Sequence, residues 1–344
     1  MKGLRLAGTL VIGAIALVGC LRFGATAIGG DHRVAGRNLG HPGVFELADP
    51  TGFTQVIAVS DVHGMDPALV QLLTAAKVID AQQKWAAGRT LLIVVGDSID
   101  KGPQSIEVID RWMSLSDQAQ AAGGLVVHTL GNHEAEFLAA PNNGKAKELL
   151  AELQQRQIPL TDLTDPSRPR GAFLHQEPVA ARVGQWLFAH AGLYPNLSWS
   201  DFKTQAQSVL SQGAYGDPFL ADGNSILEAK DWWKDAAARQ QLEARLTSNG
   251  MFGLVQGHQP KAYNMPNTIG AIDSGRLIKI DNGMAPEAGS NPGHLLRFSQ
   301  PAELTKAAFP HADVIGPDGT VTPLVPAKDL PPAPAGGNQA DAEP

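Results

Sequence analysis

The sequence contains a single cysteine, Cys20, among its 344 residues. No intrachain disulfide can form, so burial of apolar side chains must stabilise the fold. The chain also lacks any cluster of lysine and arginine, and its formal net charge is −7. Nucleic acids and anionic membrane surfaces are bound through clustered basic residues, so neither is expected as the main partner. The length suffices for one large α/β domain or for two small domains.

The first 20 residues have the pattern of an export signal. Lys2 and Arg5 precede an apolar run at 6–18, which is shorter than the about 20 residues of a membrane-spanning helix. The run ends in Leu17-Val18-Gly19-Cys20, which resembles the lipobox of bacterial lipoproteins. This resemblance implies a lipid on Cys20 and an exported protein that is periplasmic or membrane-anchored. The alternatives are a signal cleaved later, near 25–27, and an uncleaved anchor.

The rest of the chain divides into segments of different composition. We predict a lead-in at 21–52, a domain with all the chemical motifs at 53–300, an extension at 301–330 and a disordered tail at 331–344. The tail is rich in proline and small residues and has too little apolar surface to order itself. Within the domain, two stretches without motifs, about 140–180 and 196–249, are predicted to be mostly helical insertions that cap the site.

Short apolar runs alternate with amphipathic helical patterns along the domain, which is typical of an α/β fold with a parallel sheet. Residues 56–59 are rich in β-branched side chains, and Asp66-Pro67 predicts the start of a helix with Asp66 as its N-cap. Residues 91–95 are all apolar, as in a strand buried on both faces. Further strands are predicted at 125–130, 186–189, 252–255, 277–280 and 295–298. His128, inside one of them, is interpreted as a core residue.

Five polar motifs follow five of these predicted strands. They are Asp61-Val62-His63-Gly64, Gly96-Asp97-Ser98-Ile99-Asp100-Lys101-Gly102, Gly131-Asn132-His133-Glu134, His190-Ala191-Gly192-Leu193 and Gly257-His258-Gln259-Pro260. Ligands of α/β sheets bind beyond the carboxyl ends of the strands, so the five strand ends would bring these motifs to one place. Their carboxylate, imidazole and amide groups suit Mn, Fe or Zn.

A site that holds two metal ions about 3.5–4 Å apart is suited to hydrolysis of a phosphate ester. A water that bridges the ions would lose a proton near neutral pH and attack the phosphorus in line. A carboxylate shared by both ions would maintain their spacing. A neighbouring histidine could protonate the leaving alkoxide if a second carboxylate orients the imidazole.

Taken together, the five motifs resemble those of the calcineurin-like metallophosphoesterases. The elements at 131–134 and 190–193 point to the phosphoprotein phosphatase branch, and the spacing is similar to that of bacterial Shewanella-like phosphatases. The resemblance covers about residues 55–298 and implies a four-layer αββα sandwich with a mostly helical cap. It also implies two metal ions as cofactors and a phosphoprotein or small phosphomonoester as the substrate.

The resemblance implies a role for each motif residue. The implied metal ligands are Asp61 and His63 for the first ion, Asp97 for both ions, and Asn132, His190 and His258 for the second ion. His133 would protonate the leaving group, and Asp100 would orient its imidazole. Glu134 would hold a ligand or the backbone of the site in place.

Two lysines stand where the resemblance places phosphate-binding arginines. One is Lys101, and the other is Lys234 in Trp232-Trp233-Lys234, the nearest match to the Trp-Tyr-Arg or Trp-Trp-Arg element of the Shewanella-like members. Lysine cannot form the bidentate fork that arginine makes with phosphate, so substrate binding is expected to be weaker or different in shape. Trp232 and Trp233 are interpreted either as core or as a platform for the substrate.

Three other functions stay open at this point. Within the enzymes they are a dinucleoside polyphosphate hydrolase and a phosphodiesterase acting on nucleotides or lipids. Outside the enzymes, the chain could be a metal-stabilised binding module without catalysis. The intact pair of Asp100 and His133 argues against the binding module, because such a module has no need of a proton donor.

Overall fold

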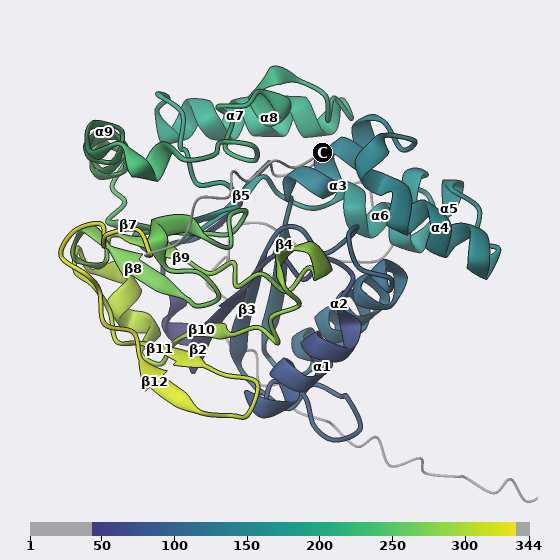
Figure 1. Cartoon of the computed structure of the whole chain (residues 1–344), viewed down its shortest axis with the longest axis horizontal. Coiled ribbons are helices and arrows are strands. Elements are labelled where there is room, and N and C mark those ends of the chain that lie inside the picture. Colours follow the sequence, from purple (N-terminus) through teal and green to yellow (C-terminus); the bar gives the residue numbers. More distant parts are fainter. Residues whose placement is uncertain (1–42, 335–344) are drawn as a thin grey trace, which may run out of the picture.

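The computed structural model describes residues 43–334, in which two six-stranded sheets pack face to face (Figure 1). The first sheet has the order β12 (Val321–Pro323), β11 (Ala312–Ile315), β10 (Leu295–Phe298), β2 (Gln55–Val59), β3 (Thr90–Val95) and β4 (Leu125–Thr129). The second has the order β1 (Phe45–Leu47), β5 (Ala180–Val183), β6 (Trp186–Ala189), β7 (Gly253–Gln256), β9 (Leu277–Lys279) and β8 (Gly270–Ile272). All the strands predicted from the sequence are present.

Alternate side chains of each central strand enter different cores, because successive residues of a strand point to opposite faces. In β2, Val56 and Ala58 pack between the two sheets, whereas Ile57 and Val59 pack against helices. β6 shows the same alternation, with Phe188 between the sheets. Both faces of the central strands are therefore buried, one against the other sheet and one against helices.

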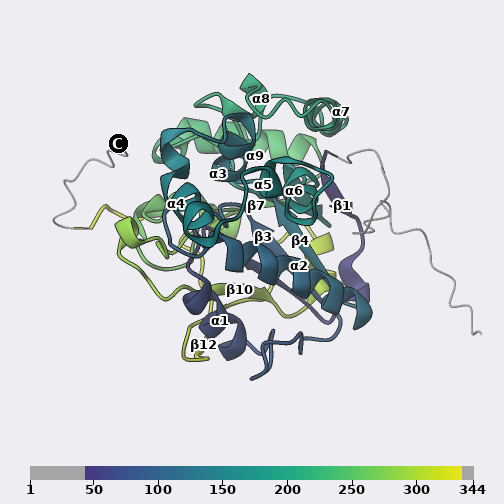
Figure 2. The ribbon, with the colours of Figure 1, turned by 90° about the vertical axis from the view of Figure 1, so that its right-hand side faces the viewer.

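Helices cover the outer face of each sheet. α1 (Asp66–Ala75) and α2 (Ser105–Ala121) cover the first sheet through side chains such as Leu72 and Trp112. α7 (Trp199–Ser211) and α9 (Ala236–Ser248) cover the second sheet through side chains such as Phe202 and Leu242. Figures 1 and 2 show α1 near the bottom of the molecule and α7 to α9 near the top. The predicted four-layer αββα sandwich is confirmed.

The two stretches expected to cap the site occupy different places. Residues 140–180 form α4 (Lys147–Arg156), α5 (Thr161–Thr164) and α6 (Pro169–His175), which share a core with α2 and α3 (Asn132–Ala139). Residues 196–249 form α7, α8 (Pro218–Ala221) and α9, and most of this stretch is the outer layer of the second sheet. Trp232 and Trp233 belong to that layer and are only 7% and 3% exposed, which supports their interpretation as core.

Parts of the segments predicted to flank the domain belong to the sheets. β1 lies at the end of the predicted lead-in 21–52 and pairs with β5, and both β11 and β12 lie in the predicted extension 301–330. Among residues 43–334, no helix is long and apolar enough to cross a membrane. The export signal predicted at 1–20, with Cys20, and most of the predicted tail lie outside the described residues.

The start of α1 differs from the prediction. Met65 holds the N-cap position, and Asp66 is the first residue of the helix. The Asp66 carboxylate instead accepts two hydrogen bonds from Arg111 on α2, at 2.6 and 2.8 Å. The planar guanidinium group satisfies both carboxylate oxygens, so this side chain joins two helices and does not cap one.

Candidate active site

Five strands from the two sheets deliver the five motifs to one site. β2, β3 and β4 run parallel in the first sheet, and β6 and β7 run parallel in the second. The motifs with Asp61, Asp97, Asn132, His190 and His258 follow the ends of these strands in that order. Because the carboxyl ends of parallel strands share one edge, ligands from segments up to 197 residues apart make direct contacts.

The loops of the site hold several side chains in an uncommon backbone conformation. Asp61, His63, Asp97, Asp100 and His258 have φ angles of 53°, 46°, 54°, 64° and 71°. This left-handed region costs about 1–3 kcal/mol for a residue other than glycine, and such strain gathers at functional sites. The sharp bends that result turn the side chains after each strand toward a common centre.

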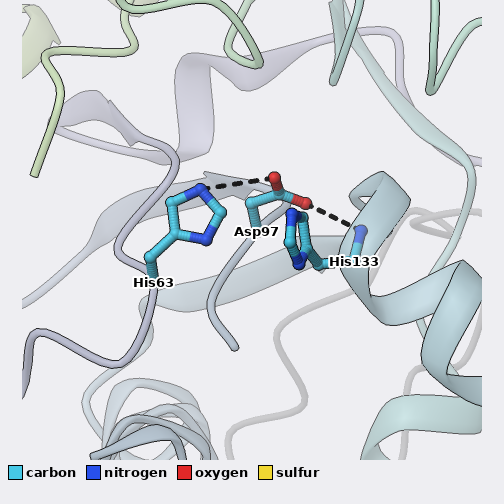
Figure 3. Close-up of side chains that lie close together, drawn as sticks. All are labelled: His63, Asp97 and His133. Carbon is cyan, nitrogen blue, oxygen red and sulfur yellow. Dashed lines mark hydrogen bonds and ion pairs between the residues drawn. The ribbon is translucent and has the colours of Figure 1, made fainter. Parts of the chain in front are cut away.

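Asp97 is that centre (Figure 3). Its Oδ2 atom lies 3.5 Å from Nε2 of His63 and 3.3 Å from Nε2 of His190, and its Oδ1 atom accepts a hydrogen bond of 3.1 Å from the backbone of His133. Two groups of ligand atoms, each within 4.8 Å of one another, share this carboxylate. One group is completed by His63 and His133, and the other by His190 and His258. A carboxylate between two such groups fits a bridge between two metal ions.

Backbone carbonyl groups select the ring nitrogens that face the centre. Nδ1 of His63 lies 3.1 Å from the carbonyl oxygen of Ile99, and Nδ1 of His190 lies 3.0 Å from that of Val95. A nitrogen beside a carbonyl oxygen must carry the hydrogen, which leaves Nε2 with the lone pair that a metal ion needs. In both rings this Nε2 atom points to Asp97.

The other two predicted ligands lie against the same group. Both carboxylate oxygens of Asp61 are 3.0 Å from the backbone nitrogen of His258, which donates to them. Oδ1 of Asn132 is 3.0 Å from Nε2 of His190. The structure therefore brings all six predicted ligands together, and their oxygen and nitrogen atoms form a donor set suited to Mn, Fe or Zn.

Burial and mutual charge shift the pKa values of these ligands strongly. Burial lowers the pKa of His63 to about 4, so its ring is neutral as a ligand must be. Burial opposes the charge of Asp97, but the imidazoles of His190 and His133 hold the pKa of this carboxyl well below its ordinary value. Burial also opposes the charge of His190, yet the Asp97 carboxylate raises the pKa of this ring to about 10. A metal ion would replace this proton at the centre.

The predicted proton donor and its partner lie beside this group. Nδ1 of His133 is 3.0 Å from Oδ2 of Asp100, and the two residues are 3% and 1% exposed. Burial raises the pKa of Asp100 to about 9 and lowers the pKa of His133 well below its ordinary value. The pair can therefore hold a proton on Asp100, beside the fixed imidazole of His133, in a site from which most water is excluded.

Glu134 forms hydrogen bonds with the backbones of two motif loops, 96–102 and 131–134. Its Oε2 atom accepts hydrogen bonds of 2.9 Å from the backbones of Gly131 and Asp97, and its Oε1 atom accepts one of 2.7 Å from Ser98 and one of 3.3 Å from Ile99. The side chain thus lies behind the ligands, in contact with the backbone of both motifs. It ties the backbone of Asp97 to the start of α3.

The two predicted phosphate-binding lysines differ in their surroundings. Nζ of Lys101 lies 3.4 Å from Glu287, and its charge contributes to the low pKa of His63, so it lies close to the ligands. Lys234 is half-exposed, pairs with Asp231 at 2.9 Å and lies over the ring of Trp233. The structure thus places Lys101 beside the centre, whereas Lys234 contacts Asp231 and Trp233 of its own turn.

Two acidic residues near the site were not among the predicted site residues. Glu287 lies 3.4 Å from Lys101. Burial raises the pKa of Asp61, and the charge of the nearby buried Asp281 raises it further. Neither belongs to one of the five motifs. The sequence offers one signal for Asp281: it directly follows a predicted strand, as the five motifs do.

Comparisons with known proteins agree with this geometry. Residues 54–275 match the family model of the calcineurin-like phosphoesterases. Uncharacterized protein C1840.07c of Schizosaccharomyces pombe is 39% identical over 268 residues, which cover 72% of this chain and 78% of that protein. Shewanella-like protein phosphatase 2 of Arabidopsis thaliana is 23% identical, with 71% and 77% covered.

A solved structure shares the fold. The cold-active protein-tyrosine phosphatase of a psychrophilic Shewanella species superposes with a TM-score of 0.65 at 21% identity, with 82% of each chain covered. At this identity the likeness concerns the arrangement of the chain and not its substrate. The family match over most of the chain, together with the two groups of candidate ligands that share Asp97, shows that the chain belongs to the calcineurin-like phosphoesterase family and is a metal-dependent hydrolase of phosphate esters.

Proposed function

We propose that the protein is a two-metal phosphomonoesterase that acts on a phosphoprotein or a small phosphate monoester. The observation that carries this proposal is the position of Asp97, which is shared by two ligand groups with the Asp100–His133 pair beside it. The relative in Arabidopsis is named a protein phosphatase, which supports the monoester over a diester.

The residues present fit two ions. Asp61, His63 and Asp97 lie beside one another and would hold one ion. Asp97, His190, His258 and the amide of Asn132 would hold the second. When bound, such ions supply an activated water and neutralise charge on the phosphoryl group. Mn²⁺, Fe and Zn²⁺ all match these ligands.

The chain itself supplies the proton that the leaving group needs. His133 receives its orientation from Asp100 through the contact at Nδ1, so that its Nε2 can face the leaving oxygen. Lys101 is proposed to contact the phosphate through its ammonium group, which is a point charge and not a fork. Its contact with Glu287 holds the side chain beside His63 before substrate binds.

A panel of substrates tests the proposal and separates it from the alternatives. Purified protein loaded with Mn²⁺ would be assayed with p-nitrophenyl phosphate, bis-p-nitrophenyl phosphate, phosphopeptides and diadenosine tetraphosphate. We expect the monoesters to be hydrolysed fastest. Preference for the diester or for the dinucleotide would replace the monoesterase proposal with a phosphodiesterase or a polyphosphate hydrolase.

We also propose that the protein is exported and tethered to a membrane through a lipid on Cys20. This proposal is based on the charged and apolar pattern before Cys20 and on the use of cysteine at that position alone. Cys20→Ala should release the protein from the membrane fraction. Unchanged membrane attachment of Cys20→Ala would contradict lipidation.

A further inference from the structure

A buried group of side chains lies behind the loop that carries Asp97. Ser98 directly follows Asp97 and is 1% exposed. Its Oγ atom accepts a hydrogen bond of 3.0 Å from Nε1 of Trp112 on α2 and lies 2.7 Å from Nε2 of His128 on β4. The loop is thereby joined to a helix and to the neighbouring strand, away from the ligands themselves.

The direction of these hydrogen bonds follows from the groups involved. The indole nitrogen of Trp112 can only donate, so Ser98 Oγ accepts from it. The Ser98 hydroxyl can then donate its hydrogen to Nε2 of His128, which carries a lone pair in the Nδ1–H form of the neutral ring. Burial lowers the pKa of His128 to about 4, in agreement with a neutral ring.

The far side of His128 faces the stretch 140–180. Nδ1 of His128 lies 3.0 Å from Oε1 of Glu177, in a geometry too bent for a hydrogen bond, and the ring packs edge-on against Phe173 of α6. Glu177 is 3% exposed, and burial raises the pKa of its carboxyl well above the ordinary value. His128 therefore stands between this helical stretch and the Asp97 loop.

Ser98 is held from two sides. Its backbone N–H donates to Oε1 of Glu134 at 2.7 Å, and the same carboxylate accepts from the backbone of Asp97. Its side chain is held by Trp112 and His128. Loss of the hydroxyl would leave two buried nitrogen atoms unsatisfied and would allow the loop to shift.

We propose that Ser98 and His128 are positioning residues that fix the Asp97 loop so that its carboxylate can serve both metal ions. The inference rests on the proposed two-metal function. Groups that orient metal ligands from behind typically change metal affinity by about 10–100-fold when they are removed. The same effect is expected here, although neither residue touches an ion or the substrate.

The experiment measures Mn²⁺ binding to the metal-stripped full-length protein by calorimetry, without substrate. We expect Ser98→Ala to fold and to bind Mn²⁺ about tenfold more weakly. In saturating Mn²⁺ its kcat should be reduced while its KM for p-nitrophenyl phosphate stays the same. His128→Gln keeps an acceptor for the serine hydroxyl and should bind Mn²⁺ better than His128→Leu.

The matched control is Thr90→Val, at the start of β3, the strand that leads into the Asp97 loop. Thr90 is fully buried, and its hydroxyl donates to the carbonyl of Ala87. Its loss should lower the stability and leave Mn²⁺ affinity unchanged. Wild-type affinity in folded Ser98→Ala, or equal loss in Thr90→Val, would overturn the inference alone. A wild-type protein that binds no Mn²⁺ would overturn the proposed function together with it.

Discussion

Nδ1 of His133 lies 3.0 Å from Oδ2 of Asp100, and both side chains are buried beside the carboxylate of Asp97. The contact fixes the ring so that its other nitrogen can face a substrate. It is the feature that distinguishes a catalytic centre from a metal site with a purely structural role.

Replacement of the proton donor should reduce turnover more than metal affinity, because Asp61, His63 and Asp97 remain to hold the first ion. We expect His133→Asn to lower kcat by about 10²–10⁴-fold, because this is the usual contribution of general acid catalysis. The loss should be larger for phenyl phosphate than for p-nitrophenyl phosphate, whose leaving group needs no proton. Equal losses for the two esters would contradict the assigned role. Asp100→Asn should give the same pattern with a smaller loss.

A methyl group at residue 131 should disturb the bridging carboxylate. A Cβ atom on Gly131 would lie 2.0 Å from Oδ1 of Asp97, far inside van der Waals contact. We therefore expect Gly131→Ala to lose most of its Mn²⁺ affinity and activity. Gly144→Ala is the control, since a Cβ there meets nothing within 4 Å. Full activity in Gly131→Ala would show that the site does not depend on this position of Asp97.

The stability of the metal-free protein should depend on pH through Asp100. Burial raises the pKa of Asp100 to about 9 in the folded state, against about 3.9 in an unfolded chain. The folded state thus binds a proton that the unfolded state releases, so this contribution to stability is complete below about pH 4 and disappears as pH rises through about 9. Urea unfolding at several pH values in EDTA should show a smaller loss for Asp100→Asn than for the wild type. An unchanged pH dependence would count against a protonated Asp100.

Lys101 and Lys234 should differ in their effect on substrate binding. Lys101 lies beside His63, whereas Lys234 contacts Asp231 and Trp233. We expect Lys101→Ala to raise the KM for p-nitrophenyl phosphate about tenfold or more, as for loss of a charged hydrogen bond. Lys234→Ala serves as the comparison and should change KM less. A larger effect of Lys234→Ala would reverse this assignment.

The sequence predicted the strands well because their signal is local. Residues 91–95 are all apolar, and in the structure this run is a central strand with both faces buried. The motif residues could be predicted equally well, because the ends of the strands bring them together regardless of their separation in the chain. Contacts between other distant segments could not be predicted from the sequence. Asp66 has the local sequence pattern of a helix N-cap. In the structure its carboxylate accepts a hydrogen bond from Arg111, which is 45 residues away in the chain.

Interactions behind the site were also hidden in the sequence. His128 was interpreted as core, and it is buried, but its contact with Ser98 depends on the register of β3 and β4. The stretch 196–249 was expected to cap the site because it carries no motif. Its apolar residues pack on the outer face of the second sheet, a property visible only once β6, β7 and β9 are placed side by side.

The most direct test of the two-metal account combines metal content with activity in one preparation. Protein stripped with a chelator and reloaded with Mn²⁺ would be analysed for bound metal and for hydrolysis of p-nitrophenyl phosphate. Asp97→Asn would be the variant, and Asp117→Asn, an exposed position on α2, its control. We expect two ions per chain and metal-dependent hydrolysis in the wild type and in the control, and loss of both in Asp97→Asn. Activity that survives metal removal, or an Asp97→Asn protein as active as the wild type, would contradict the account.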